Sequence, residues 1–171
     1  MLVKAWDPSD RKSYFKQFNL QKSDDALRKI LSGIGILAKG ELAGERIDVA
    51  LDTLDQEDEH SCFSDNTHRD IQTNLQGIVN VYFGSFGPYH GPGLKNLLTQ
   101  EDQRQFESVL QKAQIAVGHL EVPFDHALVK RNSPAWKKAQ EAVKALYMLG
   151  NEISGLGQKT GIGQIRVQLP G

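Results

Sequence analysis

The sequence predicts an all-α fold, a four-helix bundle with a long polar loop between its first and second helices. Apolar residues recur at three- and four-residue steps in four separate stretches. Capping residues, glycines and prolines separate these stretches, and no alternating strand pattern precedes about residue 160. A chain of 171 residues can bury a sizeable core. Four amphipathic helices bury their apolar faces most simply by packing together.

The first helix is expected over residues 24–54. Ser23 is a capping residue type, and Asp24 and Asp25 place negative charge where a helix N-terminus favours it. This stretch also contains glycines, each of which costs about 1 kcal/mol relative to alanine inside a helix. The glycines predict either close contact with a neighbouring helix or a break near Gly40. They are Gly33, Gly35, Gly40 and Gly44.

A polar loop over residues 55–66 separates the first helix from the second. The second helix is expected to begin at Ser64 or Asp65, one of which caps it, and to end at Phe83. Residues 84–93 are rich in glycine and proline, and we expect a loop there.

The third helix opens at Thr99, close to a capping box, and cannot continue through Pro123. The fourth begins at Ser133, which a proline follows at the first helical position. Gly155 and Gly157 are expected to end it.

Three divisions of the chain follow from this pattern. Residues 1–22 are expected to be a linker or short helix arriving from an upstream half, residues 23–157 the bundle, and residues 158–171 a tail. The first residues lack the basic start, long apolar middle and cleavage site of a signal peptide.

The composition excludes some functions. The formal net charge is −1 and no dense basic stripe occurs, which argues against nucleic acid as a partner. Cys62 is the single cysteine, so no intrachain disulfide can form. Neither His-Glu-x-x-His nor Cys-x-x-Cys is present, so the sequence does not support a specific zinc site.

One face of the first helix changes from apolar to acidic along its length. About eighteen residues complete five α-helical turns, so positions eighteen apart share a face. The acidic part comprises Glu41, Glu45, Asp48 and Asp52. One interpretation is a solvated helix end, and the other is a cleft whose clustered carboxylates attract hard cations.

The polar loop combines carboxylate, imidazole and thiol groups, which are ligands for several transition metals. His68 lies on the inward stripe of the second helix, either as a core histidine or facing the acidic end of the first helix. Cys62 is a possible nucleophile with His60 or His68 as its base, although a small buried residue is the simpler interpretation.

Two stretches, residues 40–46 (GELAGER) and 56–68 (QEDEHSCFSDNTH), resemble the second-half signature of the imelysin family, and residues 80–82 (NVY) also fit. The resemblance extends from about Trp6 to the end of the chain. The family includes iron-regulated protein A-like and insulin-cleaving-membrane-protease-like proteins.

The resemblance implies two helical-bundle halves that face each other, with a site at their interface. It also implies export to the periplasm or attachment to the outer membrane, and a link to iron acquisition. Members are also classed as peptidases.

One motif of the family's first half, Gly-x-His-x-x-Glu, is absent here. None of the five histidines occurs in it: His60, His68, His90, His119 and His126. The chain is therefore expected to be a second half alone. Its expected partners are the amino-terminal half or a second copy, and membrane-associated iron-uptake proteins.

The resemblance and the polar loop together define a candidate ligand-binding group: Glu45, Arg46, Glu57, Glu59, His60, Ser61, Asp65 and His68. The expected ligands for iron or another divalent metal are Glu45, Glu57, Glu59, His60 and His68. Arg46 is expected to pair with one of these carboxylates. The function favoured is binding of iron or an iron-bearing ligand; the alternatives are a metallopeptidase and a non-catalytic helical interaction domain.

Overall fold

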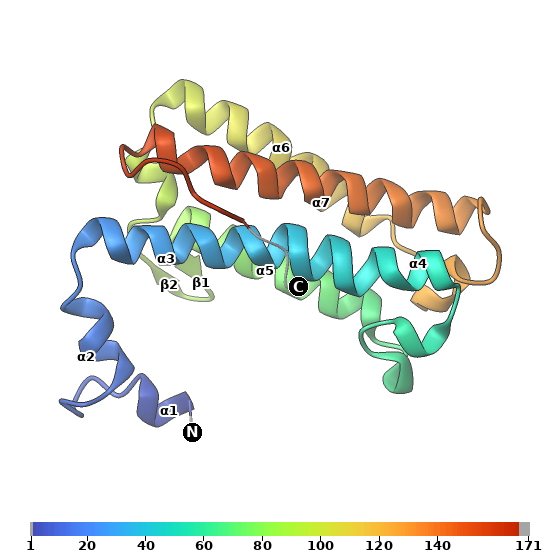
Figure 1. Ribbon diagram of the computed structural model, residues 1–171, viewed down its shortest axis with the longest axis horizontal. Coiled ribbons are helices and arrows are strands. Elements are labelled where there is room, and N and C mark those ends of the chain that lie inside the picture. Colours follow the sequence, from blue (N-terminus) through green and yellow to red (C-terminus); the bar gives the residue numbers. More distant parts are fainter. Residues whose placement is uncertain (1, 168–171) are drawn as a thin grey trace.

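The computed structural model describes residues 2–167 and confirms the all-α class (Figure 1). One long helical rod consists of α3 (Ser23–Ile36), η1 (Leu37–Asp48) and α4 (Val49–Thr53). Three further long helices follow: α5 (Thr67–Phe83), α6 (Gln100–Gly118) and α7 (Pro134–Lys159). All four lie close to their expected positions.

The four long helices pack around a common core. α7 lies against α3 and η1 on one side and against α6 on the other, while α5 contacts both α6 and η1. Tyr82 of α5 stacks on Phe106 of α6 with ring centroids 4.5 Å apart, and both side chains are fully buried. Aromatic pairs of this kind stabilise a core beyond the area that they bury.

Local capping explains where two helices begin. Thr99 accepts a hydrogen bond from the backbone N–H of Asp102, and Ser133 accepts one from that of Trp136. The expected cap of the second helix was wrong. Asn66 precedes α5, and Asp65 has a left-handed backbone with φ of 49°, which turns the chain before the helix starts.

The glycine-rich middle of the rod forms a π-helix, η1, rather than a break. Hydrogen bonds in a π-helix join residues five apart, so each residue turns the helix through a smaller angle than in an α-helix. Positions eighteen apart therefore do not share a face across η1. The expected single acidic face is accordingly divided: Asp48 receives a hydrogen bond from Gln140, whereas Asp52 is exposed and pairs with Arg131.

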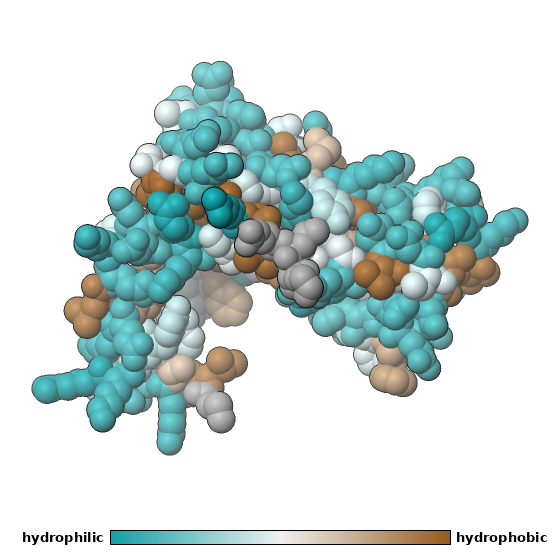
Figure 2. Space-filling view, viewed as in Figure 1, coloured by the Kyte–Doolittle hydropathy of each residue, from teal (hydrophilic) through white to brown (hydrophobic). Residues whose placement is uncertain are grey.

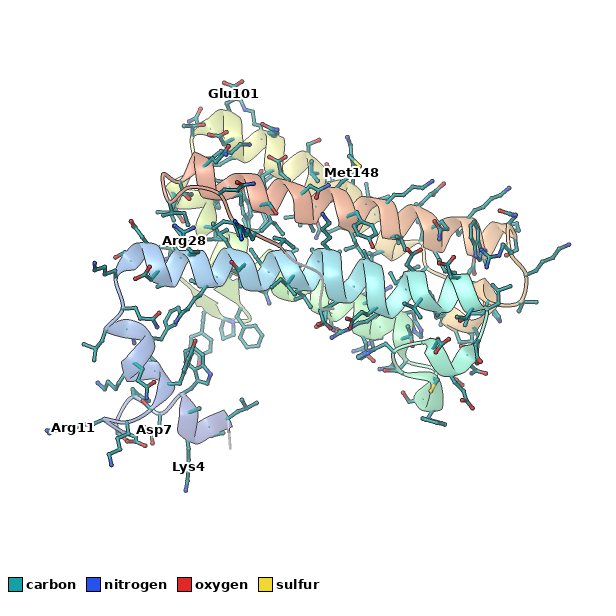
Figure 3. All side chains as sticks on the ribbon, in the orientation of Figure 1. Lys4, Asp7, Arg11, Arg28, Glu101 and Met148 are labelled. Atoms are coloured by element: carbon teal, nitrogen blue, oxygen red, sulfur yellow. The ribbon has the colours of Figure 1, made fainter. Side chains whose placement is uncertain are left out.

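The expected end of the fourth helix was also wrong, because α7 continues through Gly155 and Gly157 to Lys159. A Cβ on Gly157 would lie 2.3 Å from the carbonyl oxygen of Gly163, so this glycine allows the following segment to pack closely. Arg28 of α3 holds the same segment by donating to the carbonyls of Ile162 and Gln164 (Figure 3). The last four residues of the expected tail lie outside the described residues.

The segment between α5 and α6 contains short regular elements where a loop was expected. Its two-residue strands β1 (Ser85–Phe86) and β2 (Tyr89–His90) pair antiparallel, and the 3₁₀ turn η4 (Leu94–Leu97) follows.

An N-terminal arm, residues 2–20, projects from the start of α3 and contains α1 (Leu2–Ala5) and α2 (Tyr14–Asn19). Trp6, Tyr14 and Phe18 form its small aromatic cluster, with the rings of Trp6 and Tyr14 5.2 Å apart. Figure 2 shows a hollow between the arm and the bundle. Within residues 2–167 no helix is both long and apolar enough to cross a membrane.

Candidate metal centre

Two connections meet at the end of the bundle opposite the N-terminal arm (Figure 1). The loop after α4 contains two 3₁₀ turns, η2 (Gln56–Asp58) and η3 (Cys62–Ser64). The connection from α6 to α7 contains a third, η5 (Phe124–Ala127). The side-chain amide of Gln56 joins them by donating to Oδ2 of Asp125 over 2.9 Å.

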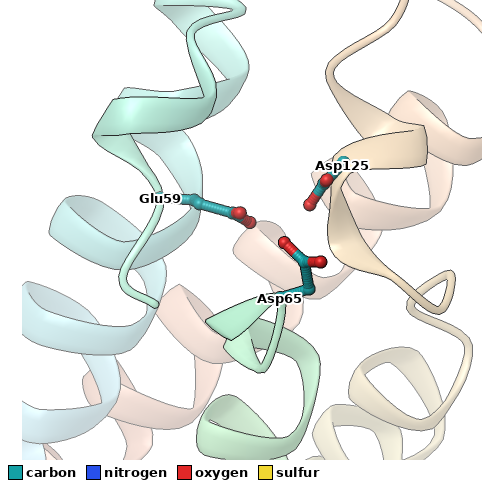
Figure 4. A group of neighbouring side chains, drawn as sticks. All are labelled: Glu59, Asp65 and Asp125. Carbon is teal, nitrogen blue, oxygen red and sulfur yellow. The ribbon is translucent and has the colours of Figure 1, made fainter. Parts of the chain in front are cut away.

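Three carboxylates converge at this junction. Glu59, Asp65 and Asp125 each offer one oxygen, and these oxygens all lie within 4.8 Å of one another. Figure 4 shows the side chains pointing toward a common space from three separate segments. Glu59 is buried, Asp125 half-buried and Asp65 exposed, so the group opens to solvent on one side.

Within residues 2–167 the buried part of this group has no neutralising partner. Glu59 is 4 % exposed, and neither of its carboxylate oxygens accepts a hydrogen bond of acceptable geometry from residues 2–167. The buried Oδ1 of Asp125 is likewise unpaired within that range. No lysine, arginine or histidine of the described chain forms an ion pair with any of the three carboxylates.

This environment changes the acidity of Glu59. Burial raises the pKa of its carboxyl group to about 7, and the carboxylates of Asp125 and Asp65 act in the same direction. The Thr67 hydroxyl opposes the shift without making a hydrogen bond of good geometry to Glu59. The centre therefore favours a positive charge, either a proton or a cation, beside Glu59.

Hydrogen bonds fix the loop that carries Glu59 and Asp65. The fully buried Thr67 accepts the backbone N–H of Ser61 over 2.9 Å. The Ser61 hydroxyl donates to Asp70, which also accepts from the side chain of Asn66. These bonds tie both ends of η3 to the first turn of α5.

Most of the residues expected from the sequence lie outside this centre. Glu45, Glu57 and His60 are exposed. His68 is half-buried in the first turn of α5, and its buried Nδ1 has no hydrogen-bond partner within residues 2–167. Ser61 contributes through the loop network rather than as a ligand.

The expected partner of Arg46 was wrong. Its guanidinium lies 3.2 Å from the carboxylate of Glu41, on the same helical segment. The π-helical spacing brings residues five apart together, whereas an α-helix brings residues three or four apart together. Arg46 therefore forms its ion pair with Glu41 and not with Glu45 or a carboxylate of the loop.

Of the expected residues, Glu59 and Asp65 belong to the centre, whereas Asp125 was missed. It lies 60 residues after Asp65, in a connection without a motif. The order of the helices could have indicated this residue. In a bundle of alternating helices the first and third connections lie at the same end, so polar residues of the third connection were candidates to meet the polar loop.

The fold and the site define an all-α domain with a three-carboxylate centre that could hold a hard cation. Three oxygen ligands suit Ca²⁺, Mg²⁺ or Mn²⁺, and leave positions for water or another ligand. A family model described as imelysin matches residues 1–153. The chain belongs to the imelysin family. The comparison with curated proteins found no match.

Proposed function

We propose that this imelysin domain binds a metal ion at the loop end of its bundle, with iron as the physiological ion. The single observation that carries the proposal is Glu59. Its carboxylate is buried, unpaired and directed at two other carboxylates.

The free energy of burial supports a bound cation. An ionised carboxylate removed from water is strongly destabilising unless it is paired or coordinates a metal. Here the described chain supplies only further negative charge, from Asp65 and Asp125. A divalent or trivalent cation compensates two or three of these charges at once, whereas a single proton neutralises one.

Metal content provides the direct test. Protein purified without an affinity tag is dialysed against a chelator, incubated with ferrous or ferric iron, desalted and examined by elemental analysis. We expect about one ion per chain. Retention of no iron would overturn the assignment of iron, and retention of no ion after separate incubations with Mn²⁺ and Zn²⁺ as well would overturn the proposal.

We also propose the cellular compartment and the partner that the family suggests. Iron uptake outside the cytoplasm would use this domain together with a second half-domain, supplied by an amino-terminal segment or by another copy. Exposed apolar side chains on the N-terminal arm, including Leu2, Val3 and Leu20, support such a partner.

A metal-dependent hydrolase is the alternative that the same centre permits, since a bound ion with open positions can activate water. It predicts cleavage of an unfolded protein substrate that stops when the metal is chelated. Metal-loaded protein that leaves casein intact over a day would restrict the function to binding.

A further inference from the structure

We propose that the ion is a hard, oxygen-preferring cation held by Glu59, Asp65 and Asp125, and that the imidazole and thiol groups of the same loop do not bind it. This inference rests on the proposed function, because it names the ligands and the class of ion. In this site Asp125 of η5 is the third ligand, beside Glu59 and Asp65 of the polar loop.

The spacing of the oxygens fits a single ion. Two oxygens bound to one ion are separated by at most twice the metal–oxygen distance, or about 5 Å for an ion with bonds of 2.3–2.6 Å. The three oxygens lie within 4.8 Å of one another, inside that limit. An ion at the centre of three oxygens with this spacing lies at most about 2.8 Å from each, so Ca²⁺ fits after a small contraction and Mn²⁺ or ferric iron after a larger one.

The buried carboxylate is an observation separate from the clustering of acidic residues. Both oxygens of Glu59 are shielded from water and lack partners within residues 2–167. Such a group needs a proton or a cation in the space that it faces, and above pH 7 the cation is the favoured partner. Figure 4 shows that Asp65 and Asp125 face the same space, so the partner that satisfies Glu59 also contacts them.

Softer ligands are available in the loop but lie elsewhere. Among residues 2–167, no histidine or cysteine belongs to a group of three or more ligand atoms within bonding reach of one ion. His60 is exposed and Cys62 is a free, half-buried thiol. Without nitrogen or sulfur ligands, the site loses the bonds by which Zn²⁺ is usually held in proteins.

The site is also built in advance of binding. Gln56 donates to Oδ2 of Asp125 and leaves the unpaired Oδ1 of that carboxylate free to bind. Asp65 keeps a left-handed backbone, a conformation that aspartate and asparagine tolerate better than most residues. An ion at this position would connect the loop after α4 to η5.

Conservative variants separate the carboxylates from the other groups. Glu59→Gln, Asp65→Asn and Asp125→Asn each remove one charge with little change in shape, and asparagine suits the backbone at residue 65. Matched controls nearby are Glu57→Gln, an exposed carboxylate of the same loop, and the triple variant His60→Ala/Cys62→Ser/His68→Ala, which extends into the first turn of α5.

Calorimetric titration with Mn²⁺, Ca²⁺ and Zn²⁺ tests the assignment, with circular dichroism confirming that each variant is folded. We expect each carboxylate variant to weaken Mn²⁺ binding at least tenfold and both controls to bind as the wild type does. Whatever its affinity, Zn²⁺ should follow the same pattern, with weaker binding in each carboxylate variant and unchanged binding in the triple variant.

Two other outcomes overturn the inference in different ways. If metal binds but the triple variant abolishes binding while Asp125→Asn does not, the ligands are the imidazole and thiol groups and only the proposed function stands. If the wild type binds none of these ions and no iron, both proposals fail.

Discussion

At the scale of single residues, Glu59 makes the stability of the metal-free domain depend on pH. The pKa of its carboxyl group in the folded protein is about 7, above the ordinary value of 4.5. For an acid whose pKa rises on folding, the stability that it contributes is fully present below the unfolded pKa. That stability is lost as pH increases between about 4.5 and 7.

The substitution Glu59→Gln should therefore stabilise the chelator-treated protein at pH 8 by about 1–3 kcal/mol, because a neutral amide replaces an unpaired buried charge. The stabilisation should shrink toward pH 5, where the wild-type carboxyl group is protonated. Urea unfolding at several pH values measures both quantities.

The exposed Glu57→Gln serves as the control and should show little dependence on pH. A difference between Glu59→Gln and wild type that is the same at pH 5 and pH 8 would contradict the assignment of the raised pKa to Glu59.

Two acidic residues of the polar loop could be predicted for the site, but their burial could not. Glu59 and Asp65 could be selected because they occur in a loop dense with ligand-type side chains. Nothing in the sequence distinguishes Glu59, which is buried, from Glu57, which is exposed two residues earlier. The loop that carries Glu59 meets η5 through Gln56 and Asp125, a long-range contact that no local sequence pattern indicates.

At the scale of elements, the glycines of the helices have different roles. A Cβ on Gly150 of α7 would lie 2.6 Å from Cβ of Lys39 in η1, so the two helices approach as closely as glycine permits. A Cβ on Gly33 of α3 would meet nothing within 4 Å. Gly33 therefore incurs the entropic cost of glycine without a packing benefit.

Substituting alanine should have opposite effects at these two positions. Gly150→Ala should destabilise the domain by about 1–3 kcal/mol, because Cβ of Lys39 is fixed to its helix and the helices must separate. Gly33→Ala should stabilise it by up to about 1 kcal/mol through helix propensity. Denaturant unfolding measures both, and equal effects of the two substitutions would disprove this distinction.

The starts of α6 and α7 could be predicted because Thr99 and Ser133 act on backbone groups three residues away. A helix cap involves only residues close together in the chain, so it can be recognised from the sequence. The π-helix η1 could not be predicted, because its wider turn is stable only in the context of its packing against α7. That change of pitch is also why the expected acidic face of the first helix was not found.

At the scale of the whole molecule, the two candidate surfaces lie at opposite ends of the bundle. The carboxylate centre occupies the loop end, and the N-terminal arm with its exposed apolar side chains occupies the other (Figure 1). The helical rod of residues 23–53 separates them by roughly 45 Å, at about 1.5 Å per residue. Sites this far apart with no shared contacts usually act independently.

If the arm binds a second copy, the wild-type chain should associate as its concentration rises in sedimentation velocity. The variant Val3→Ser/Leu20→Ser removes two of the arm's most exposed apolar side chains and should shift the distribution toward monomer. Val129→Ser is the control, because Val129 is similarly exposed but lies between α6 and α7 at the opposite end. Metal content should be unchanged in both variants because neither touches the carboxylate centre.

Wild-type protein that remains monomeric at every concentration would exclude a second copy, and the arm would then require a different partner. Loss of metal in the arm variant would show instead that association and binding are coupled through the rod.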